Sequence, residues 1–186
     1  QVVAIKPDFA GMHNNLGNVY RELGELDAAL KSYKKAIAIK PDFVEAFFNQ
    51  GITFQAQNQL DSAVKSYEEV ISIKPNSAEA HNNLGTIFLE LKQLENAEET
   101  FKQAILLNPK YAGAHYNLGN TLKDLRKIYE AEESFRKAIV INPNYTEAHN
   151  NLGNIMKSHD RLEDAEASYR KAIAINPDYA EAHNNL

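Results

Sequence analysis

Apolar residues recur along the chain with the spacing of helical faces, twice within each segment that separates one proline from the next. Between Pro7 and Pro41, the first stripe consists of Leu16, Val19, Tyr20 and Leu23. The second stripe consists of Leu26, Ala29, Leu30, Tyr33, Ala36 and Ile37. Each segment therefore predicts two amphipathic helices, with a chain reversal between them near Gly24 and a stop at the following proline.

This segment is a repeat, because several residue types return every 34 positions. The prolines are Pro7, Pro41, Pro75, Pro109, Pro143 and Pro177. Glycines stand at Gly17, Gly51, Gly85, Gly119 and Gly153. Alanines stand at Ala29, Ala63, Ala97, Ala131 and Ala165, and aromatic residues at Tyr33, Tyr67, Phe101, Phe135 and Tyr169. We expect the glycines to permit close helix packing, with Gly17 facing Ala29.

The repeat predicts one all-α domain over residues 1–186. Its units span residues 10–43, 44–77, 78–111, 112–145 and 146–179, with residues 1–9 as the tail of a preceding helix and residues 180–186 opening a further repeat. The polar residues after five of the six prolines are expected to cap the next helix: Asp8, Asp42, Asn76, Asn144 and Asp178. Both ends are expected to lack a polar cap and to stack on a neighbour.

The chain resembles the tetratricopeptide repeat family in its period and in the residues Leu16-Gly17-x-x-Tyr20, Ala29-x-x-x-Tyr33 and Pro41. It departs from that pattern where the family usually has tryptophan, at His13, Phe47, His81, His115 and His149. The resemblance implies a right-handed superhelical solenoid of antiparallel helix pairs, about five and a half repeats long. It also implies that the first helix of each pair lines a concave groove that holds a peptide.

Composition excludes several classes of protein. The 186 residues carry a net charge of −5, which disfavours nucleic acid as a partner, and contain no cysteine. No apolar run is long enough to predict a membrane span. The histidines stand on successive helices, too far apart to share a metal ion, and no catalytic motif accompanies them. We therefore expect no metal, no cofactor and no catalytic residue, so the chain is not predicted to be an enzyme by itself.

The residues with no evident scaffold role are asparagines that precede the Leu-Gly or Gln-Gly pair, and we call them the amide register. They are Asn15, Asn49, Asn83, Asn117, Asn151 and Asn185. A carboxamide can bond both the C=O and the N–H of an extended peptide, so groove binding is one interpretation. The other is that these amides tie adjacent helices together. The family resemblance implies that two further sets of positions line the groove beside the amide register. The first set is Asn14, Phe48, Asn82, Tyr116 and Asn150. The second set is Asn18, Ile52, Thr86, Asn120 and Asn154.

The sequence thus predicts an interaction scaffold that binds a protein or peptide segment in the groove through the amide register. The run His-Asn-Asn-Leu-Gly-Asn at 13–18 and 149–154 resembles the repeats of O-linked N-acetylglucosamine transferase, which implies an alternative as the substrate-docking arm of a larger enzyme. A third hypothesis is head-to-tail self-association. Glu45, Glu79 and Glu147 at the groove edge favour neutral or basic ligands, although Arg21, Lys123 and Lys157 lie nearby in the pattern.

Overall fold

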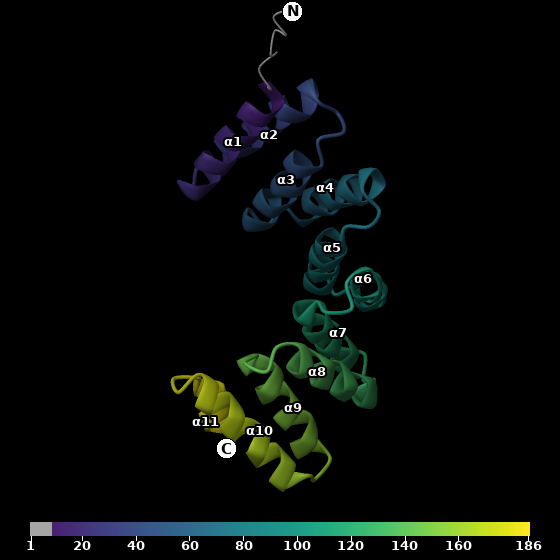
Figure 1. The fold of residues 1–186 in the computed structure, drawn as a ribbon, viewed down its shortest axis with the longest axis vertical. Helices are drawn as coiled ribbons and strands as arrows, with labels where there is room; N and C mark the ends of the chain where they lie inside the picture. Colours follow the sequence, from purple (N-terminus) through teal and green to yellow (C-terminus); the bar gives the residue numbers. More distant parts are fainter. Residues whose placement is uncertain (1–8) are drawn as a thin grey trace, which may run out of the picture. The chain divides into compact units, whose positions relative to one another are not determined.

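A computed structural model describes residues 9–186, and within this range it consists of eleven α-helices and no strand (Figure 1). The first helices of the repeats are α1 (Phe9–Glu22), α3 (Val44–Ala56), α5 (Ala78–Glu90), α7 (Ala112–Asp124), α9 (Thr146–Ser158) and α11 (Ala180–Asn185). The second helices are α2 (Leu26–Ile39), α4 (Leu60–Ile73), α6 (Leu94–Leu107), α8 (Ile128–Ile141) and α10 (Leu162–Ile175). The all-α class is confirmed. The tail expected at residues 1–9 falls largely outside the described residues, and Phe9 begins α1.

The described residues divide into two compact units, with the boundary between residues 87 and 88, inside α5. In the first unit, α1 packs against α2, α2 against α3, and α3 against α4. In the second unit, the same succession runs from α6 to α11. Within each of these two successions, each helix therefore packs against its neighbours in sequence, as expected for a stack of helix pairs.

In four of the helix pairs, an aromatic ring from the second helix lies against a glycine of the first. A Cβ added to Gly17 would lie 2.4 Å from Cε1 of Tyr33, and one added to Gly119 would lie 2.7 Å from Cε1 of Phe135. Both rings are fully buried. The expectation that Gly17 faces Ala29 is therefore wrong in detail: the absent side chain makes room for the larger ring, whose burial contributes more apolar area.

The reversal between the two helices of a pair uses a left-handed backbone residue in every repeat. Gly24 has φ +77°, and the equivalent non-glycine residues are Asn58, Lys92, Arg126 and Asp160, with φ between 57° and 62°. Asparagine and aspartate adopt this conformation more readily than other non-glycine residues. The turn geometry is therefore constant although its residue varies, and Lys92 and Arg126 occupy it at an energetic cost.

The expected capping by residues after proline is wrong at α3, α7, α9 and α11, while Asp8 lies outside the described residues. The N-caps of α3, α7, α9 and α11 are Phe43, Tyr111, Tyr145 and Tyr179, and none makes a side-chain capping bond. The side chains that do accept a backbone hydrogen bond in this segment belong to the asparagines before the prolines. Asn108, Asn142 and Asn176 each accept a hydrogen bond from the backbone N–H two residues later, at 3.2 Å. These asparagines fix the proline turn as Asx turns, so they shape the connection rather than the helix start.

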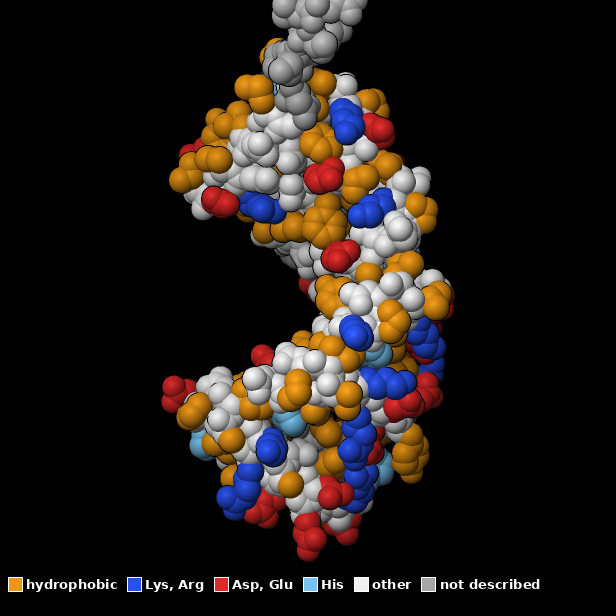
Figure 2. Space-filling view, in the orientation of Figure 1, with side chains coloured by type: hydrophobic (Ala, Val, Ile, Leu, Met, Phe, Trp, Pro, Cys, Tyr) orange, Lys and Arg blue, Asp and Glu red, His pale blue; other side chains and the backbone are white. Residues whose placement is uncertain are grey.

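Apolar side chains are exposed along α1, as the space-filling view shows at that helix (Figure 2). They are Phe9, Met12, Leu16, Val19 and Leu23. The equivalents of Val19 in later repeats, Thr53, Ile87, Thr121 and Ile155, are all buried. The first repeat therefore leaves uncovered a face that later repeats cover. No helix among residues 9–186 has the length and apolar character needed to cross a bilayer.

Candidate functional site

In the first unit, the amide register links neighbouring first helices. Asn49 on α3 donates from Nδ2 to Oδ1 of Asn14 on α1, at 3.1 Å. Its own Oδ1 lies 3.5 Å from Nη1 of Arg21, which donates to it from the last turn of α1. Asn15 on α1 is exposed and makes no hydrogen bond among the described residues. The amide of Asn49 therefore has an intramolecular role, whereas that of Asn15 faces solvent.

The second unit repeats this link twice. Asn151 on α9 donates from Nδ2 to Oδ1 of Asn120 at 2.9 Å and to the hydroxyl of Tyr116 at 3.4 Å, both on α7. Asn185 on α11 donates from Nδ2 to Oδ1 of Asn150 on α9 at 3.0 Å. The amides thus join consecutive first helices through side-chain pairs. This observation supports the interpretation that the register ties helices together, at least through its nitrogen atoms.

The oxygen atoms of the same amides are less occupied. Oδ1 of Asn151 and Oδ1 of Asn185 have no hydrogen-bond partner among the described residues. No side-chain nitrogen or oxygen in residues 9–186 is both buried and unpaired. These two oxygens are therefore reached by solvent, and each can accept a hydrogen bond from outside the chain.

Asn83 on α5 has a different partner. It donates from Nδ2 to the hydroxyl of Tyr67 on α4 at 3.3 Å, and its Oδ1 accepts from Asn82 at 3.4 Å. Burial raises the pKa of Tyr67 to about 12, against the smaller lowering effect of the Asn83 bond. The phenol therefore stays protonated at physiological pH. Asn117 on α7 is half-exposed.

The neighbouring positions expected in the groove divide into buried asparagines and half-buried aromatic residues. The asparagines Asn14, Asn82 and Asn150 are only 7%, 8% and 1% exposed. They offer little surface to a ligand, and Asn150 also donates from Nδ2 to Glu181 at 3.4 Å. These three residues are therefore not included in the binding surface proposed below.

Phe48 and Tyr116, the expected apolar anchors, are half-buried and pack against other rings. Phe48 meets Tyr67 edge-on, with ring centroids 5.6 Å apart. Tyr116 lies 4.8 Å from the ring of Tyr145 and 5.8 Å from that of Phe135. Each ring therefore contributes to the packing within its own repeat and keeps part of its surface accessible.

The remaining expected groove positions include asparagines that accept hydrogen bonds from buried tyrosines of the second helices. The hydroxyl of Tyr33 donates to Oδ1 of Asn18, and that of Tyr169 donates to Oδ1 of Asn154, each at 2.9 Å. These bonds satisfy the polar end of rings that are otherwise enclosed. Asn154 is exposed, while Asn18 and Asn120 are half-buried. Asn18 and Asn154 therefore have a structural role that the sequence pattern did not indicate.

Four of the histidines bind backbone rather than metal. Nε2 of His81, His115, His149 and His183 lies 2.8–3.2 Å from the carbonyl oxygen of the proline six residues earlier. Because a carbonyl only accepts, Nε2 carries the hydrogen. Burial lowers the pKa of His115, and its bond to Pro109 opposes this in part. In residues 9–186 no group of three or more His, Asp or Glu side chains could hold a metal ion.

Family comparison agrees with these features. A TPR repeat profile matches residues 17–58, 53–91 and 158–186, and tetratricopeptide repeat profiles match residues 78–111, 112–145 and 134–167. The chain belongs to the tetratricopeptide repeat family. Members of this family serve as protein-interaction scaffolds.

Solved tetratricopeptide structures share the fold. MamA superimposes with a TM-score of 0.82 at 26% identity, over 89% of this chain and 97% of MamA. YrrB, described as a TPR protein with an unusual peptide-binding site, has a TM-score of 0.77 at 24% identity, over 95% and 91% of the two chains. PilF from Pseudomonas aeruginosa has a TM-score of 0.81 at 20% identity, over 96% and 89%. The comparison with curated proteins gives no match.

Proposed function

We propose that this protein is a scaffold whose amide register binds an extended segment of a partner protein. The observation that carries this proposal is that Oδ1 of Asn151 and Oδ1 of Asn185 are unpaired and accessible while their Nδ2 atoms are held by neighbouring helices. The fixed nitrogen orients the amide, so its oxygen is preorganised to accept a backbone N–H. The proposal also includes Asn117 in the second unit and, in the first unit, the register residues Asn15, Asn49 and Asn83.

The chemistry favours a neutral or basic segment of modest affinity. Glu45, Glu79 and Glu147 are exposed on the same first helices, and their charges attract cations. A neutral hydrogen bond contributes about 0.5–1.5 kcal/mol net. Five or six such bonds, less the cost of ordering the segment, correspond to roughly micromolar dissociation constants.

A peptide selection tests this proposal. Peptides are selected from a random library displayed on phage against the whole chain, and the dissociation constant of the best peptide is measured by fluorescence anisotropy. The combined substitution Asn83→Ala, Asn117→Ala and Asn151→Ala is expected to weaken binding at least tenfold. The control Asn76→Ala with Asn144→Ala removes two exposed amides that follow prolines and lie outside the register, and we expect it to leave binding within about threefold. Equal losses in the two variants would contradict the proposal.

Self-association is a second candidate, favoured by the exposed apolar stripe of α1. Contiguous exposed apolar surface of this kind is typical of interaction sites. Sedimentation velocity at several concentrations tests it. Association that rises with concentration and disappears in Met12→Glu with Val19→Glu supports this role, and a monomer at high concentration would contradict it.

A further inference from the structure

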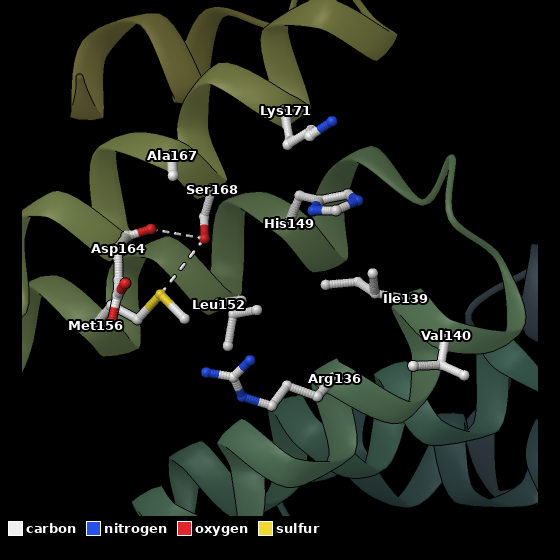
Figure 3. A pocket seen from close by; sticks show the side chains of 10 residues that line it. All are labelled: Arg136, Ile139, Val140, His149, Leu152, Met156, Asp164, Ala167, Ser168 and Lys171. Carbon is white, nitrogen blue, oxygen red and sulfur yellow. Dashed lines mark hydrogen bonds between the residues drawn. The ribbon is translucent and has the colours of Figure 1, made fainter.

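Two surface pockets of nearly equal size occupy the same position in the repeat, one in each unit. The pocket of the second unit encloses about 360 Å³ between α8, α9 and α10 (Figure 3). The pocket of the first unit encloses about 380 Å³ between α2, α3 and α4. Every lining residue of the first-unit pocket has its counterpart, three repeats later, in the lining of the other. The recurrence shows that the repeat itself creates the hollow.

The hollow lies where the first helix carries a residue smaller than the family's tryptophan. That position is Phe47 in the first unit and His149 in the second, and both line their pockets. The imidazole of His149 is also held at 2.9 Å by the carbonyl of Pro143. A tryptophan at this position would add ring volume that these residues lack. The two pockets therefore follow directly from the departure from the family pattern.

Both pockets combine an apolar floor with a cation on each of two opposing helices. In the second unit the apolar residues include Ile139, Leu152 and Met156, with Arg136 on α8 and Lys171 on α10. In the first unit Ile37 and Phe54 are flanked by Lys34 on α2 and Lys65 on α4. The single carboxylate of each lining is Asp164 or Glu69. Each pocket thus carries one net positive charge.

The cations are largely available to a ligand. Lys34, Lys65 and Lys171 have no ion-pair partner among the described residues, while Arg136 binds Glu132. Asp164 is already paired with Arg161 at 3.1 Å. Its negative charge therefore offsets the charge of Lys171 less than an unpaired carboxylate would. At the rim of the second-unit pocket, Val140 is 80% exposed. The pocket therefore has apolar surface at its mouth as well as at its floor.

We propose that each pocket binds a bulky apolar side chain of a partner protein that is flanked by Asp or Glu. A volume near the lower limit of ligand pockets, about 300 Å³, suits one anchoring side chain rather than a large cofactor. The opposed cations select carboxylates on both sides of that anchor. The two pockets are separate from the amide register, which favours neutral or basic segments. Each chain therefore has two equivalent sites for such an anchor.

The experiment uses a synthetic decapeptide with a central Phe between Asp and Glu residues, titrated into the whole chain by calorimetry. Two sites per chain are expected. The substitutions Phe47→Trp and His149→Trp, which fill the pockets with the family's own residue, should each remove one site. Lys65→Glu and Lys171→Glu should each weaken one site at least fivefold, and Lys74→Glu with Lys110→Glu is the charge-matched control. Circular dichroism verifies that each variant remains helical.

Three results would overturn the proposal. One is no binding of the decapeptide by the unaltered chain, and another is binding that all four pocket variants leave unchanged. The third is binding that is lost in the Asn83, Asn117 and Asn151 alanine variant but not in the pocket variants, because the decapeptide would then occupy the amide register. That last result would leave the proposed function intact.

A decapeptide with Gly for Phe, or Lys for the acids, is expected to bind at least tenfold more weakly.

Discussion

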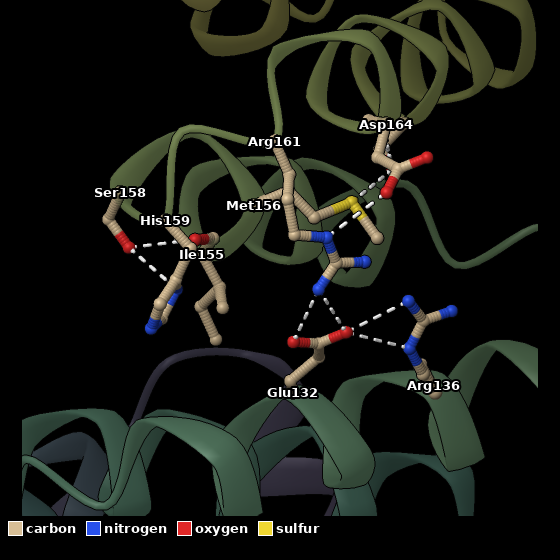
Figure 4. A network of polar contacts seen from close by, with 9 residues as sticks. Glu132, Arg136, Ile155, Met156, Ser158, His159, Arg161 and Asp164 are labelled. Atoms are coloured by element: carbon tan, nitrogen blue, oxygen red, sulfur yellow. Dashed lines mark hydrogen bonds and ion pairs between the residues drawn. The ribbon is translucent and has the colours of Figure 1, made fainter.

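Nη1 of Arg161 lies 3.0 Å from both carboxylate oxygens of Glu132, so that the residue before α10 is tied to α8 of the preceding repeat (Figure 4). Glu132 also accepts from Nε and Nη2 of Arg136 one turn along its own helix. The same arrangement occurs one repeat earlier, where Glu98 binds Lys102 and Lys127. A half-buried carboxylate that bridges two cations therefore joins successive repeats in the second unit.

Substitution of Glu132 by Gln is expected to destabilise the fold by about 1–2 kcal/mol, because the Glu132 side chain is only 14% exposed and two charged hydrogen-bond partners lose the anion. Urea denaturation followed by circular dichroism measures this change. The matched control is Glu133→Gln, which removes an exposed pair with Lys137 and should have a much smaller effect, because solvent screens that pair. Indistinguishable losses would show that the bridge contributes nothing beyond a surface pair.

Acid should weaken this bridge. Burial raises the pKa of Glu132, but the hydrogen bonds from Arg136 and Arg161 outweigh burial and hold that pKa below its usual value. The same balance lowers the pKa of Glu98. Because these pKa values are lower in the folded state, the stabilisation is complete above the unfolded value near 4.3 and is lost as pH falls through the folded values.

The measurement is the free energy of unfolding from pH 7 to pH 3. Glu132→Gln should show a smaller decrease below pH 4.5 than the unaltered protein. A parallel decrease in both proteins would assign the acid sensitivity to other carboxylates.

The left-handed turn residues offer a stabilising change. Arg126 has φ +62°, where glycine has no steric penalty. We expect Arg126→Gly to stabilise the protein by about 0.5–1 kcal/mol. By the same reasoning Gly24→Ala should destabilise it by a similar amount, since no atom lies within 4 Å of an added Cβ and only the backbone conformation is strained.

Thermal and urea unfolding measure both changes. Lys123→Gly, within the last turn of α7, is the control and should cost up to about 1 kcal/mol. Destabilisation by Arg126→Gly would contradict the assigned turn energetics.

The glycine and aromatic pairs predict a specific coupling. Gly119→Ala places a Cβ 2.7 Å from Cε1 of Phe135 and should cost about 1–3 kcal/mol. Phe135→Leu also costs stability, because the buried ring is lost. The double variant should be less destabilised than the sum of the two, since the smaller side chain admits the new methyl group. A double-mutant cycle in urea measures the coupling, and strict additivity would contradict direct packing.

Much of the fold could be predicted from sequence because it depends on local pattern. The spacing of Pro41 and its repeats, with two apolar stripes between, is sufficient to predict the helix pairs. The partner of Gly17 could not be predicted, since the choice between Ala29 and Tyr33 depends on the axial offset of two helices. The capping prediction failed because Asn144 lies in the proline turn, where its N–H donates to Oδ1 of Asn142, and α9 begins only after Tyr145.

The place of the amide register on the first helices follows from the sequence, but the bonds that its amides make do not. The register of Asn151 follows from the repeat, whereas its bonds to Asn120 and Tyr116 depend on the distance between α7 and α9. The bridge between Glu132 and Arg161 was detectable in the sequence, because Glu98 and Lys127 stand in the same relation one repeat earlier. The sequence analysis did not identify it. Phe47 and His149, at the family's tryptophan position, were a signal for the two pockets, but the lining of each pocket comes from three helices and required the structure.

The central claim is that amide oxygens of the register accept hydrogen bonds from a bound peptide backbone. The most direct measurement combines Asn151→Ala with N-methylation of the selected peptide at successive backbone positions, with dissociation constants determined for each combination. We predict one position at which N-methylation weakens binding to the unaltered protein at least threefold but does not weaken binding to Asn151→Ala. If N-methylation has the same effect on both proteins at every position, the claim is wrong.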